Sequence, residues 1–224
     1  MNIYKKYRLI ALGFSLIGAG FVQADLISVA GLIAADSSDS WRDIFQDLRP
    51  SLVLSGISTT PVDIGNHHIT ILGYNVETAP DLSPEEVGYI RRELKSFMMS
   101  AMKQAVGRFD AIAGFNLHFK NVGLAGGKIV AFLESNPFFS EYIIYVERCF
   151  IENLICAMDC GLIRREAILR YTKKHKYHPI GLHVSLATIE SGHGSVSPEH
   201  LTNSPRTPGF SVSPEKFCAT AFKF

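Results

Sequence analysis

The sequence lacks several features that would each define a class of protein. No segment repeats with the period of a solenoid or propeller, so the 224 residues are not a repeat array. Charged residues make up only 19% and hydrophobic residues 47%, which is too apolar for a disordered chain. No Cys-x-x-Cys pair occurs among the four cysteines, which argues against a structural zinc knuckle. The composition indicates one globular domain with a sizeable core.

The first 24 residues have the organisation of a secretory signal peptide. Lys5, Lys6 and Arg8 form a positive region, and Leu9 to Phe21 form an apolar run. That run is short for a membrane-spanning helix, which needs about 20 apolar residues. The segment 22–24 is a small-residue cleavage site. We predict export, periplasmic or secreted, with no stable membrane span after cleavage; an uncleaved N-terminal anchor is the alternative.

Basic charge is also scarce. Without residues 1–24, 19 Lys and Arg (22 minus 3) face 21 Asp and Glu, a net charge of −2. A protein that holds long nucleic acid usually carries a basic stripe. The short basic runs at 164–165 and 173–176 are more typical of solvated helix ends or loops. We therefore expect no long double-stranded nucleic acid as a partner, and we expect a monomer.

Four cysteines would permit disulfides in an exported protein: Cys149, Cys156, Cys160 and Cys218. The first three lie in an apolar helical pattern, where a free cysteine is commonly a small buried hydrophobe. We expect at most one bridge, and its pairing stays open.

Two apolar runs carry a histidine and a hydroxyl residue two positions apart. They are His68-Ile69-Thr70 and, 115 residues later (183 minus 68), His183-Val184-Ser185. In an extended chain, residues i and i+2 point to the same face. His68 and Thr70 should therefore share one face of a strand, as should His183 and Ser185, with the flanking apolar residues buried opposite. Such strands could form a phosphate site.

The bare pattern is weak, because the chain has 8 histidines and many Ser and Thr residues. Two further matches, at His193 and His200, lie in Gly, Pro and Ser-rich sequence without alternation. Only His68 and His183 have apolar residues at the alternating positions. His118 lies on the polar side of another predicted strand, where we expect a surface histidine.

The periodicity predicts an α+β domain with helices outside an antiparallel-rich sheet. Ser83 and Glu86 form a capping box for the clearest helix. The expected elements are a helix at 41–48, strands at 52–54 and 67–74, a turn at 58–61, a helix from Pro84 to about Gly107, a hairpin at 115–133, a helix at 137–160 with further helical turns at 162–174, and a strand at 181–189. The domain should span 25–190, followed by an irregular Ser/Pro-rich tail at 191–224.

The paired motifs resemble the His-x-Thr/Ser signature of the 2H phosphoesterase superfamily, which includes 2′-5′ RNA ligase-like proteins and cyclic nucleotide phosphodiesterases. The resemblance covers about residues 50–190, where the expected elements follow the family's order. It implies two similar lobes of antiparallel-rich sheet with outer helices, related by a pseudo-twofold axis, around a central cleft. It also implies hydrolysis of 2′,3′-cyclic phosphates or of 2′-5′ or 3′-5′ phosphodiesters of a small nucleotide or RNA end, without a metal or other cofactor.

This chemistry agrees with the residue types. Two imidazoles on opposite sides of a phosphate can remove one proton and deliver another, because histidine titrates near neutral pH. We expect His68 and His183 to be catalytic, and the hydroxyls of Thr70 and Ser185 to bind the phosphate oxygens. Which histidine is the acid stays open.

Two alternatives remain. The first is a non-catalytic module that binds a phosphate or nucleotide in the same cleft. The second is a metal-dependent hydrolase that uses His67, His68 and His183 with an acidic residue. Neighbouring histidines on a strand point to opposite faces, which makes it difficult for His67 and His68 to share a metal.

Overall fold

An antiparallel sheet forms the centre of the protein, and helices pack against it. The computed structural model describes residues 24–35, 38–63, 65–109, 115–174, 181–191, 196–197, 201 and 209–223. Within these residues, the strands are β1 (Leu26–Ala35), β2 (Ser58–Pro61), β3 (His68–Thr78), β4 (Phe115–Ala125), β5 (Lys128–Glu134), β6 (Ile168–Lys173), β7 (Leu182–Ser191) and β8 (Gly209–Lys223). The helices are α1 (Ser38–Leu54), α2 (Pro84–Phe109) and α3 (Pro137–Asp159), with a 3₁₀ turn at Arg165–Ala167. The predicted α+β class with an antiparallel sheet is confirmed.

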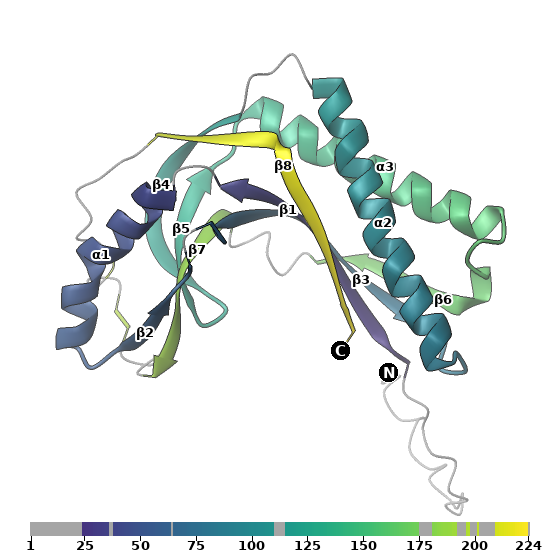
Figure 1. Ribbon diagram of the computed structural model, residues 1–224, viewed down its shortest axis with the longest axis horizontal. Coiled ribbons are helices and arrows are strands. Elements are labelled where there is room, and N and C mark those ends of the chain that lie inside the picture. The colour runs from purple at the N-terminus through teal and green to yellow at the C-terminus, as the bar shows by residue number, and fades with distance from the viewer. Residues whose placement is uncertain are drawn as a thin grey trace, which may run out of the picture.

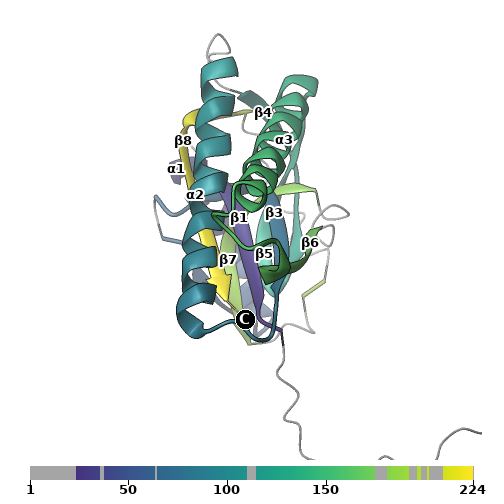
Figure 2. The same cartoon turned by 90° about the vertical axis from the view of Figure 1, so that its right-hand side faces the viewer.

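The strand order is β2-β7-β5-β4-β8-β1-β3-β6, with one additional pairing between β7 and β3. Figure 1 shows the strands bent into an arch, with α1 beside β2, β5 and β7 and with α2 and α3 beside β1, β3 and β6. The long strand β8 runs between the two sides of the arch. Figure 2 shows α2 and α3 lying side by side against the strands.

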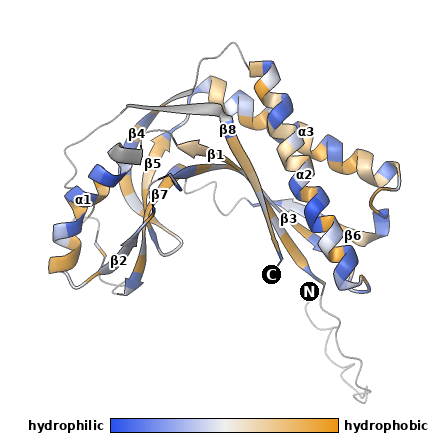
Figure 3. Cartoon of the chain, in the orientation of Figure 1, coloured by the Kyte–Doolittle hydropathy of each residue, from blue (hydrophilic) through white to orange (hydrophobic). Residues whose placement is uncertain are grey.

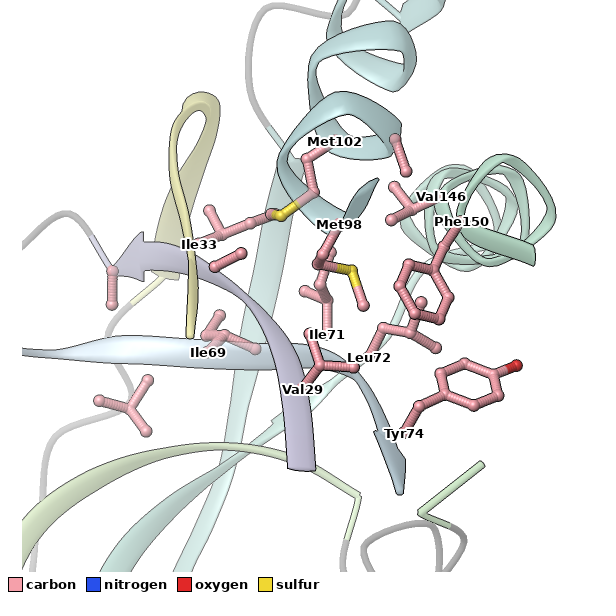
Figure 4. Packing of buried hydrophobic residues seen from close by; sticks show 14 of the residues in the cluster. Val29, Ile33, Ile69, Ile71, Leu72, Tyr74, Met98, Met102, Val146 and Phe150 are labelled. Atoms are coloured by element: carbon pink, nitrogen blue, oxygen red, sulfur yellow. The ribbon is translucent and has the colours of Figure 1, made fainter. Parts of the chain in front are cut away.

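The core lies between the helices and the sheet. Helix α2 begins at the predicted capping box, where the Ser83 N–H donates to Glu86 Oε2 at 2.8 Å and the Glu86 N–H donates to Ser83 Oγ at 3.2 Å. Its methionines pack closely on Gly31 of β1. A Cβ added at this glycine would lie only 3.0 Å from Met102 Sδ and 3.1 Å from Met98 Sδ. Figure 4 shows these methionines above the apolar residues of β1 and β3. In Figure 3 the helices carry both hydrophobic and hydrophilic residues, as expected for helices with one buried face.

Helix α3 also follows its sequence signals and is tied to the sheet by a polar contact. The Asn136 side chain caps it by accepting from the Phe139 N–H at 2.8 Å, and Gly161, just after its end, has a φ of +76°. The Tyr74 hydroxyl of β3 donates to Glu147 at 2.6 Å, and the ammonium of Lys173 on β6 contacts the same carboxylate. This contact places Tyr74 and Lys173 on the helix-covered face.

Several predicted boundaries are wrong. Residues 52–54 end α1 instead of forming a strand, because Leu52 continues the buried stripe of Ile44 and Leu48 at helical spacing. Residues 58–61 form β2 at the edge of the sheet instead of a turn, since they pair with β7. Residues 162–174 hold the 3₁₀ turn and β6, which pairs with β3, instead of further helical turns. A short apolar run does not by itself distinguish helix from strand.

The expected irregular tail is wrong for residues 209–223, which form β8. This strand pairs with β1 on one side and with β4 on the other. The expected signal peptide lies, apart from Ala24, outside the described residues, as do the matches at His193 and His200. The described helices include none that is long and apolar enough to cross a membrane.

Candidate functional site

The two histidine motifs meet in the sheet. Ile69 of β3 pairs with Val184 of β7 in antiparallel register. In such a ladder the neighbours on either side are also opposed, so His68 lies across from Ser185 and Thr70 lies across from His183. The histidine of each motif therefore lies across the two strands from the hydroxyl residue of the other motif.

All four polar side chains face away from the helices. Ile69 and Val184 are both 0% exposed and belong to the core. His68 and Thr70 are exposed, and His183 and Ser185 are half-buried. The predicted alternation is confirmed around both motifs, at residues 67–70 and 183–186. We call the side of the sheet that carries these four residues the motif face.

The two imidazoles have matching hydrogen bonds. His68 Nδ1 lies 2.9 Å from the Asn66 carbonyl oxygen, and His183 Nδ1 lies 3.1 Å from the Gly181 carbonyl oxygen. A carbonyl oxygen can only accept, so Nδ1 carries the hydrogen in both rings. Both Nε2 atoms are then available to accept or deliver a proton. Gly181, whose carbonyl accepts from His183, has a φ of +77°, a backbone conformation that favours glycine.

Phe132 of β5 packs beside His183 on the motif face. The two residues are paired across the strands, and their rings meet edge to face with centroids 6.2 Å apart. The Phe132 ring also covers Gly123 of β4, where a Cβ would lie only 2.4 Å from Phe132 Cε2. Gly123 thus leaves the space that lets the aromatic ring support His183. An isolated glycine within a strand often marks such a close approach, and this signal was present in the sequence.

We expect Gly123→Ala to lower the free energy of unfolding by about 1–3 kcal/mol, because the new methyl group overpacks the Phe132 ring. Urea denaturation will measure the change. The matched control is Phe132→Ala, which removes the ring: Gly123→Ala should cost much less in that background, as a double-mutant cycle would reveal. An equal cost in both backgrounds would contradict the packing argument.

His67 points away from the motif face and is 4% exposed. Its Nδ1 has no hydrogen-bond partner among the described residues. Burial, and secondarily the charge of His68, lowers the pKa of His67. The predicted opposition of His67 and His68 is confirmed, since one is buried and the other exposed.

The lowered pKa of His67 predicts that acid destabilises the fold. The unfolded chain, with a pKa near 6.5, binds more protons than the folded one, so stability should fall as the pH drops through and below that value. In His67→Leu this part of the acid sensitivity should disappear. Urea midpoints of both proteins at pH 7.5 and pH 5.0 will test this, and equal pH dependence would show that His67 is not responsible.

Besides His67, His68 and His183, the described residues include one further histidine, His118. It is exposed, as predicted, and lies on β4, where it pairs with Glu134 of β5. No group of three or more His, Cys, Asp or Glu side chains placed to hold a metal ion occurs within the described ranges. The metal-binding alternative built on His67 therefore has no ligand set in that part of the chain.

No family model and no curated protein matches this chain. Its function is therefore inferred from the paired strands themselves.

Proposed function

We propose that the protein is an exported, metal-independent phosphodiesterase of the 2H phosphoesterase type. It hydrolyses 2′,3′-cyclic phosphates, or 2′-5′ or 3′-5′ phosphodiesters, of nucleotides or RNA ends. The observation that carries the proposal is the antiparallel Ile69–Val184 pair, which brings two His-x-Thr/Ser motifs together with all four polar side chains on one face of the sheet. If either histidine had only a structural role, its motif would not need a second His-x-Thr/Ser motif on the paired strand.

The hydrogen bonds of the two histidines support acid–base catalysis. One Nε2 removes a proton from a water molecule, whose oxygen attacks phosphorus. The other imidazole, in its protonated form, delivers a proton to the leaving oxygen as the P–O bond breaks. The carbonyls of Asn66 and Gly181 hold both rings through Nδ1, so that Nε2 of each can face the phosphate.

The hydroxyls of Thr70 and Ser185 complete the proposed site. Each lies across the ladder from the histidine of the other motif. They donate hydrogen bonds to the non-bridging oxygens, where negative charge increases in the transition state. Each strand supplies one histidine and one hydroxyl residue, in opposite directions about the Ile69–Val184 pair. This arrangement also supports the proposed pseudo-twofold relation of two lobes, with the twofold axis passing through that pair.

A substrate panel tests the function. The purified protein is incubated with 2′,3′-cyclic nucleotides and with 2′-5′-linked and 3′-5′-linked oligonucleotides, with and without EDTA. We expect turnover of at least one class, unchanged by EDTA and lost in His183→Ala. Strong inhibition by EDTA would contradict the metal-free mechanism. Calorimetric binding of nucleotides without turnover would instead identify a binding module.

A further inference from the structure

Lys174 lies along the edge of β3 that also pairs with β7, close to the two motifs. This edge pairs with β7 at Ile69 and with β6 from Tyr74 onward. Lys174 directly follows β6, and its backbone N–H donates to the Gly73 carbonyl at 2.8 Å. Lys174 and His183 are therefore both neighbours of β3, at Gly73 and at Thr70 respectively.

The side chain of Lys174 lies on the motif face. Strand β3 has an irregularity opposite Gly31 and Leu32, and Ile71 and Leu72 are both buried there. The alternation is thus shifted by one residue, which returns Gly73 to the face of Thr70.

A Cβ at Gly73 would lie 3.4 Å from Lys174 Cδ and 3.5 Å from its Cβ, so the lysine stem runs across β3 directly over the glycine. The absence of a side chain at Gly73 lets the stem lie flat on the strand. A chain laid on the sheet in this way keeps its ammonium close to the motif face, since only Cε and Nζ extend beyond Cδ.

The preceding residue provides a contrast. Lys173 pairs with Tyr74, and its ammonium contacts Glu147 of α3 on the helix-covered face. The two lysines thus lie on opposite sides of the sheet. Farther along the motif face, Glu77 is bonded to Arg170 at 2.8 Å.

Lys174 is half-buried, and desolvation lowers the pKa of its ammonium. A partly desolvated cation gains more from a nearby anion than a fully hydrated one, because the effective dielectric is lower. This environment suits a lysine that meets phosphate.

We propose that Lys174 forms an anion subsite beside the two histidines and binds a second phosphate of the substrate. The inference rests on the proposed function. Gly73 lies three positions after Thr70, which is roughly 10 Å along a strand before the irregularity shortens it. Lys174 is therefore placed to bind a phosphate next to the one under attack. The favoured substrates are nucleotides with two phosphate groups, such as a 5′-phosphorylated 2′,3′-cyclic nucleotide or an oligonucleotide end.

Calorimetry with adenosine 3′-phosphate and adenosine 3′,5′-bisphosphate tests the subsite without requiring turnover. The wild-type protein should bind the bisphosphate about 10–100-fold more tightly, as expected for a charge-assisted contact. Lys174→Met should lose this preference, and Lys174→Arg should retain most of it. Lys173→Met is the matched control, since it removes a neighbouring charge from the other face and should keep the wild-type preference.

The inference is overturned if wild type binds the two nucleotides equally or not at all, or if Lys174→Met keeps the preference. The same preference should be seen in kcat/KM for a 2′,3′-cyclic nucleotide with and without a 5′-phosphate. The two proposals fail separately. Lys174-dependent binding without hydrolysis would refute only the phosphodiesterase, and hydrolysis indifferent to the second phosphate would refute only the subsite.

Discussion

Replacing His68 or His183 with alanine should each lower kcat/KM for the hydrolysed phosphodiester about 100- to 10,000-fold, the usual contribution of a general acid or base. Each histidine lies opposite the hydroxyl residue of the other strand, so neither can substitute for its partner. Initial rates on a 2′,3′-cyclic nucleotide, measured at several substrate concentrations, will give kcat and KM separately. The loss should be mainly in kcat, because proton transfer occurs in the transition state.

The matched control is His118→Ala, which removes an exposed histidine from β4 and should leave kcat/KM unchanged. The double variant His68→Ala/His183→Ala should lose less than the product of the two single losses, because both residues serve one reaction step. Retention of wild-type activity by either single alanine variant would refute the two-histidine mechanism. Circular dichroism of each variant will verify that the fold persists.

The faces of the histidine strands could be predicted from sequence, but their contact could not. Alternation around Ile69 and Val184 determines which side chains are buried, and this depends on local pattern alone. The pairing of these two residues joins strands far apart in the chain, so it depends on the whole sheet. The resemblance to a known family suggested that the motifs share a site, while local periodicity could not.

The positions of Lys174 and Phe132 at the motif face could not be predicted from the sequence, for related reasons. Lys174 belongs to a short basic segment that is typical of a solvated loop, and it reaches the motif face only because β6 pairs with β3. The buried pair Ile71 and Leu72 shifts the alternation of β3, and nothing in the local sequence indicates that shift. Phe132 resembled any other residue of a hairpin strand, although Gly123 marked where its ring lies.

The strand β8 was not predicted because the stretch 191–214, which leads into it, is rich in Ser and Pro. Strand propensity is strongly dependent on context, and here two existing strand edges supply the context. β1 pairs with Ala219 and its neighbours, and β4 pairs with residues 209–212. A segment that is weak by itself becomes a strand here because β4 pairs with its first part and β1 pairs with its second.

Deletion of residues 209–224 should therefore abolish folding. β8 lies between β4 and β1 in the strand order, so its loss leaves both neighbouring edges unpaired and the two parts of the sheet joined only by the β7–β3 pairing at Ile69 and Val184. The lost hydrogen bonds and packing should exceed the roughly 5–15 kcal/mol that stabilises a typical domain. Thermal melting followed by circular dichroism should show no cooperative transition. A soluble truncated protein that melts cooperatively would show that β8 is dispensable.

A pair of point variants tests the same strand without removing it. Ala219 is 3% exposed and pairs with Gly31, on which the α2 methionines pack, whereas the neighbouring Cys218 is exposed. Ala219→Asp would bury a carboxylate under α2, so the free energy of unfolding should fall by roughly 3 kcal/mol or more. Cys218→Ser should change it by no more than about 0.5 kcal/mol. Equal effects of the two substitutions in urea denaturation would mean that β8 does not present Ala219 to the core.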